Sequence, residues 1–299
     1  MLHPEIGREI KMNINHRNKM DKIKKLVLGL IVALTLNSCS DQKRENDWTK
    51  DNLKAKVLSF KKFIYTTEDS LTNSESSREL VAQTSYDENG YKVESMQYNS
   101  EGNLESKWTY MYGNRGDKLE WNLRNADGTL ESNWTYKYDD EGNNTEENQY
   151  NSDGRLESKE SYKYDKGNKI EGESYNSSGA LTSKDTYKYD NKGNKIEWNQ
   201  YNAAGTLESK WTYKYDDKGN NIEWNQYSSD GSLESKNTSK YDDKGNKIEE
   251  EKYNSKATFL SGKFTYKYDY DENGNWTKKI DSENDTPKYI VEREYEYYK

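Results

Sequence analysis

The stretch YNAAGTLESKWTYKYDDKGNNIEWNQ, residues 201–226, carries the pattern that decides the fold. It contains two turn signals, Asn-x-x-Gly at 202–205 and Asp-x-x-Gly at 216–219. Asp or Asn at the first position and Gly at the last suit a type I turn closed by a left-handed residue, a common connection between antiparallel strands. The stretch is therefore predicted to form a β-hairpin.

Apolar and polar side chains alternate between the two turns. Leu207, Trp211 and Tyr215 fall on one face of an extended chain, whereas Lys210 and Lys214 fall on the other. Aromatic residues at a period of two, without Pro, indicate a strand and exclude a helix. Each strand is therefore expected to present one aromatic face and one charged face.

The same pattern recurs every 26 residues, with one unit of 25 residues. Units begin at Tyr98, Arg124, Tyr150, Tyr175, Tyr201 and Tyr227, and a degenerate unit begins at Tyr253. A single unit buries too little surface to stand alone, so neighbouring units must stack. The predicted fold class is all-β, with tandem antiparallel β-hairpin repeats that form an elongated, twisted or curled sheet.

An open sheet of these units would be roughly 65–70 Å long at about 4.8 Å per strand. Because one face is aromatic, the sheet must curl, fold over itself or coil to cover that face. The sequence does not decide among these three arrangements.

Composition agrees with an aromatic interior. Hydrophobic residues make up 30% of the chain and charged residues 33%, while Tyr contributes 27 residues and Trp 8. Large rings bury about 150–250 Å² each, so Tyr and Trp must supply the core. An aliphatic-core α/β enzyme is not expected.

Residues 20–39, MDKIKKLVLGLIVALTLNSC, have the pattern of an export signal. A basic head precedes an apolar run from Leu26 to Leu36, which is too short to cross a bilayer that needs roughly 20 residues. Met20 is therefore the expected initiator. One interpretation is an ordinary export signal, in which the single cysteine, Cys39, is incidental; the other interpretation follows from the residues around it.

Leu36-Asn37-Ser38-Cys39 resembles the lipobox of bacterial lipoproteins. The resemblance implies that Cys39 is the lipidation site and the new N-terminus, and that the protein reaches the membrane through its lipid anchor. Because Ser40 follows the cysteine, the expected location is the outer membrane, facing the periplasm or the cell surface.

The Tyr-Asp pairs that precede the second turn of each unit resemble the RHS/YD-repeat family. The matching pairs are Tyr138-Asp139, Tyr164-Asp165, Tyr189-Asp190, Tyr215-Asp216 and Tyr241-Asp242, each followed by a Gly. The resemblance covers about residues 50–299, and the closing segment from Asp271 to Tyr298 is similar to short YD-type lipoproteins of Bacteroidota-like bacteria. MORN-type repeats look similar, and both families imply stacked hairpins.

Four segments follow from these patterns. Residues 1–38 are the N-terminal extension and signal peptide, 39–52 a polar tether, 53–85 one or more capping strands with a loop from Thr67 to Glu79, and 86–299 the YD-type repeat domain.

Comparison of the units separates constant from variable positions. The first-strand Leu and the Tyr before each Asp turn never vary, so they are expected to form the core. Two other positions accept Trp in some units and Glu, Gly, Asp or Asn in others, which is not typical of a sealed interior. We expect partly exposed tryptophans in two patches, as possible ligand-binding aromatics: Trp108, Trp121 and Trp134, then Trp198, Trp211 and Trp224. The alternative is that they pad the aromatic face, since strand period places them beside the core.

Catalysis is not expected. The two His residues, His3 and His16, precede Cys39, so Ser-His-Asp, Cys-His and His-based metal chemistry are unavailable after processing. Neither a cofactor nor a metal is predicted, because the recurring acids are better explained as turn caps. A formal net charge of −8 disfavours nucleic acid as a partner.

The predicted function is a noncatalytic outer-membrane or surface lipoprotein. Its repeat array would serve as a binding scaffold or spacer for glycan or protein, because Trp and Tyr dominate interface hot spots. The alternative is an RHS/MORN-type immunity or antitoxin-like interaction protein.

Overall fold

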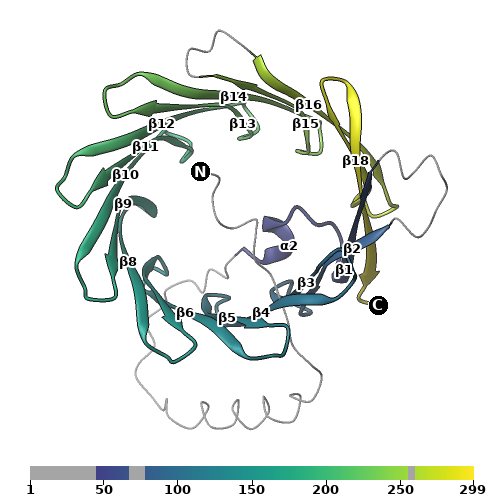
Figure 1. Cartoon of the computed structure of the whole chain (residues 1–299), viewed down its shortest axis with the longest axis horizontal. Helices are drawn as coiled ribbons and strands as arrows, with labels where there is room; N and C mark the ends of the chain where they lie inside the picture. The colour runs from purple at the N-terminus through teal and green to yellow at the C-terminus, as the bar shows by residue number, and fades with distance from the viewer. Residues whose placement is uncertain (1–44, 67–77, 255–259) are drawn as a thin grey trace.

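The chain folds into one closed antiparallel β-barrel (Figure 1). The computed structural model describes residues 45–66, 78–254 and 260–299, so the signal segment, Cys39 and most of the Thr67–Glu79 loop lie outside the described residues. Consecutive strands pair all along the chain, and β1 (Val57–Thr66) pairs with both β2 (Glu79–Tyr86) and β18 (Thr286–Tyr297). No helix in the described ranges is long and apolar enough to cross a bilayer.

The other strands follow one another around the ring. They are β3 (Lys92–Tyr98), β4 (Leu104–Tyr112), β5 (Lys118–Asn125), β6 (Leu130–Tyr138), β7 (Asn144–Asn151), β8 (Leu156–Asp165), β9 (Asn168–Asn176), β10 (Leu181–Tyr189), β11 (Lys195–Asn202), β12 (Leu207–Tyr215), β13 (Asn221–Ser228), β14 (Leu233–Tyr241), β15 (Lys247–Tyr253), β16 (Leu260–Tyr270) and β17 (Trp276–Glu283). The short helix α2 (Asp47–Lys50) lies inside the ring (Figure 1).

The prediction of tandem hairpins is confirmed, but the elongated, twisted or curled sheet is wrong. The turns form as expected: Gly205 and Gly219 have φ of 79° and 86°, and Asp216 Oδ1 accepts bonds from the backbone N–H groups of Lys218 and Asn220. Pairing of β1 with β18 closes the sheet. Closure covers the aromatic face by making it the interior, and it removes both exposed edges.

The barrel has two rims with different turns. The Asp-turn rim carries the turns after even-numbered strands, at 87–90, 113–116, 139–142, 165–167, 190–193, 216–219, 242–245 and 271–274. The Asn-turn rim carries those after odd-numbered strands, at 99–102, 125–128, 151–154, 176–179, 202–205 and 228–231. Because Val57 pairs with Tyr297, β1 begins and β18 ends at the Asp-turn rim.

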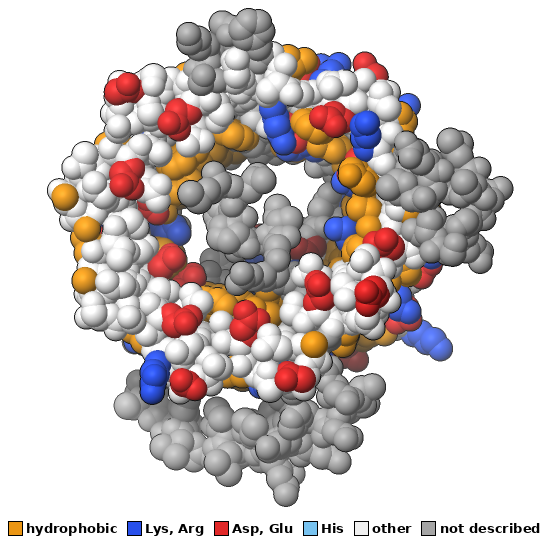
Figure 2. All heavy atoms as spheres, viewed as in Figure 1, with side chains coloured by type: hydrophobic (Ala, Val, Ile, Leu, Met, Phe, Trp, Pro, Cys, Tyr) orange, Lys and Arg blue, Asp and Glu red, His pale blue; other side chains and the backbone are white. Residues whose placement is uncertain are grey.

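The aromatic face lines the lumen and the charged face is the outer wall. Helix α2 lies within the ring (Figure 1). Tyr112 donates a hydrogen bond to Asp47 in this helix, and Tyr86 donates one to Asp51 just after it. These tyrosine side chains therefore point into the ring. Figure 2 shows hydrophobic atoms gathered along the inner surface. The two faces predicted from the alternation in residues 201–226 are therefore the inner and outer walls of the barrel.

Outward side chains form a repeated ion-paired pattern. In β11, Glu197 lies between Lys188 and Lys210 of the two neighbouring strands, with N···O distances of 2.7 Å to each. Hydrogen bonds from these lysines and Asn199 outweigh the effect of burial and lower the pKa of Glu197 to about 2. The same Lys–Glu–Lys triad is centred on Glu146, Glu171, Glu223 and Glu249.

A bulge in each hairpin changes the expected place of the first-strand Leu. Leu207 pairs with Tyr201 and Ser209 with Gln200, which leaves Glu208 unpaired and interrupts the alternation. Leu207 is therefore out of phase with Trp211. Its expected position on the aromatic face is wrong, because the register sets it with Tyr201 on the side of the lysines.

The constant Tyr of each even strand has a structural role. Tyr215 Oη donates to the backbone carbonyl of Lys195, at the start of the preceding strand, at 2.9 Å. Equivalent bonds run from Tyr138 to Lys118, Tyr189 to Lys169, Tyr241 to Asn221 and Tyr268 to Lys247, all at 2.8–3.0 Å. This tyrosine ladder ties these five strands to the start of the preceding strand, whereas the hydroxyl of Tyr112 donates to Asp47 instead. The Tyr therefore has a hydrogen-bonding role at this position.

Candidate ligand-binding lumen

One lumen-facing position in each hairpin strand forms an oblique belt around the inner wall. We call it the lumenal belt. From β4 to β14 it reads Trp108, Trp121, Trp134, Glu147, Glu160, Gly172, Asp185, Trp198, Trp211, Trp224 and Asn237. The register sets every second pair of neighbouring members directly opposite each other, as with Trp198 and Trp211. The remaining neighbours are offset by two residues, as with Trp211, which pairs with Gln226 rather than Trp224. Two arcs of tryptophan thus flank an acidic segment.

The first tryptophan arc is a continuous aromatic surface. Trp121 and Trp134 stack with centroids 3.6 Å apart and planes 3° apart, and Trp108 meets Trp121 edge-on at 5.7 Å. Trp121 Nε1 donates to Tyr136 Oη at 2.5 Å, which fixes the orientation of the indole. Trp121 and Trp134 are half-buried, but Trp108 is only 5% exposed and packs with Leu123, so the predicted partial exposure is wrong for Trp108.

The second tryptophan arc is similar. Trp198 and Trp211 stack with centroids 4.0 Å apart, and Trp224 follows on the next strand. Lys195 Nζ lies 5.5 Å from the ring centroid of Trp198 and 4.9 Å from that of Tyr213, within cation–π range. Burial, with the nearby Lys169 charge, lowers the pKa of Lys195. All three tryptophans are half-buried, so part of each ring faces the lumen.

The acidic segment lies between the arcs. Glu147 and Glu160 are directly opposite on β7 and β8, and Asp185 is opposite Gly172 on β10 and β9. Burial, and then the charge of Glu160, raises the pKa of Glu147; burial also raises that of Asp185. Like charges placed opposite each other destabilise a sheet. This segment therefore has an energetic cost that the tryptophan arcs do not have.

Tyrosines border the acidic segment with hydroxyl groups. Tyr162 donates to Glu160, and Tyr187 Oη donates to Asp185 Oδ2 at 3.3 Å. Lys169 Nζ lies 4.1 Å from the ring centroid of Tyr162 and 5.2 Å from that of Tyr187. The lumen thus combines aromatic surfaces with acceptors and donors along one wall, which is typical of a small-molecule site.

The structure brings the six predicted tryptophans together as two arcs on the lumen wall. Their place beside the tyrosines also matches the alternative, in which they pad the aromatic face. The sequence comparison treated Glu147, Glu160 and Asp185 only as tolerated replacements for Trp. These three acids occupy the same two repeat positions as the tryptophans, and this was the signal that they share one belt with them. Cys39, the predicted lipidation site, lies outside the described residues.

Comparisons with known proteins give distant likenesses of shape. No protein-family model matches the chain, and no curated protein matches it. A porin-like protein from Bacteroides uniformis shares 12% identity at a TM-score of 0.41, over 81% of this chain and 99% of that one. A porin-like protein from Bacteroides vulgatus shares 11% at 0.39, over 82% and 100%. The Photorhabdus luminescens Tc holotoxin pore shares 14% at 0.28, over 71% and 16%. With TM-scores below 0.5, these likenesses carry no argument, and function must be argued from this chain's own geometry.

Proposed function

We propose that the protein is a noncatalytic lipoprotein of the outer membrane or cell surface, whose barrel binds an extended glycan in its lumen. The observation that carries this proposal is the lumenal belt, where two tryptophan arcs flank Glu147, Glu160 and Asp185. Barrels of 16–18 strands enclose a channel rather than a packed interior. A narrow, extended ligand suits such a space better than a folded protein does.

The chemistry of the belt suits a sugar chain. The C–H face of a sugar ring can stack on a half-buried indole, such as that of Trp211 or Trp224. Sugar hydroxyls donate well to carboxylates, and Glu160 is exposed in the lumen between the arcs. Aromatic walls with a few placed polar groups give orientation and specificity.

Membrane attachment is proposed through acyl chains on Cys39. A barrel wall in contact with lipid needs an outward apolar band. From β6 to β16 the outer wall instead carries the Lys–Glu–Lys triads, such as Lys214–Glu223–Lys236 with N···O distances of 2.7 and 2.9 Å. Water is the solvent that this wall suits, so the anchor supplies the membrane affinity.

The carboxylates are proposed to bind rather than to catalyse. Glycosidases place two carboxyl groups on either side of the scissile bond. Glu147 and Glu160 project from neighbouring strands of one wall, so they reach a ligand from the same side. This arrangement suits hydrogen bonding to hydroxyls.

The test is a glycan array followed by calorimetry on Trp211→Ala and Trp224→Ala. Removing an aromatic hot spot should weaken binding by about 2 kcal/mol or more, which is roughly 30-fold. Lys210→Ala is the matched control, because it precedes Trp211 on the same strand but faces outward, and it should bind normally. Glycan binding that both tryptophan variants retain in full, or an array with no bound glycan, would contradict the proposal.

A further inference from the structure

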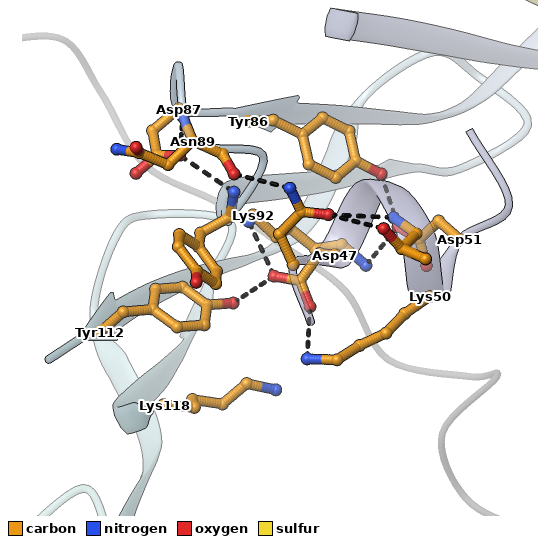
Figure 3. Close-up of polar contacts among 12 residues, drawn as sticks. Asp47, Lys50, Asp51, Tyr86, Asp87, Asn89, Lys92, Tyr112 and Lys118 are labelled. Carbon is orange, nitrogen blue, oxygen red and sulfur yellow. Dashed lines mark hydrogen bonds and ion pairs between the residues drawn. The ribbon is translucent and has the colours of Figure 1, made fainter. Parts of the chain in front are cut away.

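The segment before β1 is fixed to the Asp-turn rim (Figure 3). The backbone N–H groups of Asp47 and Trp48 both donate to the carbonyl of Gly90, at 2.9 and 3.1 Å, and Asn46 Nδ2 donates to the carbonyl of Asn89 at 2.7 Å. These partners belong to the 87–90 turn. Helix α2 is thus attached to this rim by its own N-terminal backbone.

The side chains of α2 complete the attachment. Asp47 Oδ2 accepts from Tyr112 Oη at 2.7 Å and from the Lys92 backbone N–H at 2.8 Å. These bonds outweigh burial and lower the pKa of Asp47. Trp48 is 9% exposed and its Nε1 donates to the Val57 carbonyl at 2.7 Å. A buried aromatic and a buried carboxylate make this a fixed structure.

The segment then runs along two further turns of the same rim. Asn52 Nδ2 donates to the carbonyl of Lys244 at 3.4 Å. The Lys54 backbone N–H donates to Asn275 Oδ1 at 2.7 Å, and Asn275 Nδ2 donates back to the Lys54 carbonyl at 2.8 Å. Residues 46–54 therefore bind the 87–90 and 242–245 turns and the residue after the 271–274 turn.

The length of chain back to Cys39 limits where an anchor can lie. Cys39 lies seven positions before Asn46, and at most about 3.6 Å per position gives a reach of roughly 25 Å. The nine residues of β12 alone extend about 30 Å along the strand at about 3.3 Å each. A tether fixed at one rim would be used up in crossing to the other.

A second observation points to the same rim. Eight large hydrophobic residues are exposed in the described part of the chain. Six of them lie within three residues of a turn of the Asp-turn rim: Val93, Met111, Leu119, Ile170, Ile196 and Ile248. Single exposed aliphatics are ordinary, but six around one rim form a girdle that suits a lipid interface.

We propose that the Asp-turn rim is the membrane-facing end of the barrel, and that it rests on a bilayer surface; this depends on the proposed acylation of Cys39. The Asn-turn rim is then the mouth that faces away from the membrane and admits ligand. Among the six four-residue turns described on this rim, 176–179 and 202–205 carry no charged residue, and each of the other four carries a single acid.

The experiment uses the full acylated protein in phosphatidylcholine vesicles that carry a headgroup-linked quencher. Asn191→Cys on the Asp-turn rim and Ala203→Cys on the Asn-turn rim are matched sites, because both are exposed and they flank the same strand, β11. Acylation occupies the single native cysteine, so each introduced thiol takes the fluorophore alone. We expect quenching at residue 191 to exceed that at residue 203 several-fold.

A third variant tests the cause of the orientation. Asn46→Ala with Asp47→Ala removes side-chain contacts with the rim and leaves Cys39 unchanged, so the difference between the two labels should shrink. Equal or reversed quenching in the otherwise native, acylated chain would overturn the orientation alone. If the protein instead carries no acyl chains and does not float with vesicles, the proposed anchor is overturned as well. Mass spectrometry of Cys39 shows which of these two results has been obtained.

Discussion

The outer and inner walls of the barrel are built from the same strands but vary in different ways. On the outer wall, Glu146, Glu171, Glu197, Glu223 and Glu249 repeat one ion-paired triad from β6 to β16. On the inner wall, the equivalent belt position changes from Trp to Glu to Gly to Asp while the backbone register stays constant.

The difference separates the features that the fold repeats from those that it does not. A feature that the fold needs must recur in each unit, because each hairpin meets the same neighbours. The triads and the tyrosine ladder recur in this way between β6 and β16. The lumenal belt does not, and its acidic segment opposes two carboxylates at a cost in stability. We infer that the belt composition serves a ligand.

The largest expected effect comes from breaking the tyrosine ladder. Tyr215→Ala removes a large side chain and its bond to Lys195, and it should lower the free energy of unfolding by about 3 kcal/mol. Tyr215→Phe should cost about 1 kcal/mol, because only the hydrogen bond is lost. Lys214→Ala, one residue away on the outer wall, should cost about 1 kcal/mol or less. Urea unfolding measures all three, and equal losses for Tyr215→Ala and Lys214→Ala would remove the distinction between the walls.

Acid should affect the two walls in opposite directions. The pKa values of Glu197 and Glu223 are lowered to about 2, so their contribution is present above the ordinary pKa near 4.5 and is lost as pH falls towards 2. Because the pKa of Glu147 is raised, its protonation removes the repulsion on the inner wall at a higher pH than that at which the triads lose their charge. Urea unfolding between pH 7 and 2 should show a net loss below about pH 4.5, since the triads outnumber the acidic segment.

Glu197→Gln provides the control for that titration. This variant should lose less stability between pH 4.5 and 2, because it lacks one of the carboxyl groups whose pKa is lowered. An unchanged slope would show that the triads do not stabilise the fold.

Removing the inner repulsion should have a smaller effect of opposite sign. Glu147→Gln should stabilise the barrel at pH 7 by up to about 1 kcal/mol, because it removes a charge directly opposite Glu160. The gain should disappear in acid, where Glu147 is protonated anyway. Thermal melts at pH 7 and pH 4 measure it, and glycan affinity should fall in the same variant. Lower stability at pH 7 would contradict the account.

The repeated features of the fold could be predicted from the sequence. Residues 201–226 contain both turns and the alternation of Trp211 and Tyr213 with Lys210 and Lys214, because these depend on local geometry. The six tryptophans were grouped correctly as two sets of three, since repeats of equal length set equivalent residues side by side.

Closure and the exact faces could not be predicted in this way. Whether β1 meets β18 depends on strand number, tilt and twist summed around the ring, which no single hairpin reveals. Leu207 was assigned to the wrong face because the bulge at Glu208 interrupts the alternation. The bond from Tyr215 to Lys195 joins residues 20 apart, and only the paired register brings them together.

Closure is the central claim, because it places the tryptophans in a lumen, and one cross-link tests it directly. Lys61 and Glu294 are register partners on β1 and β18. In a Cys39→Ser chain, Lys61→Cys with Glu294→Cys should form an intramolecular disulfide, since directly opposed strand residues lie about 4.5–5.5 Å apart. Non-reducing mass spectrometry should find this bond in the monomer. Two free thiols, or bonds only between chains, would indicate an open sheet and contradict the barrel.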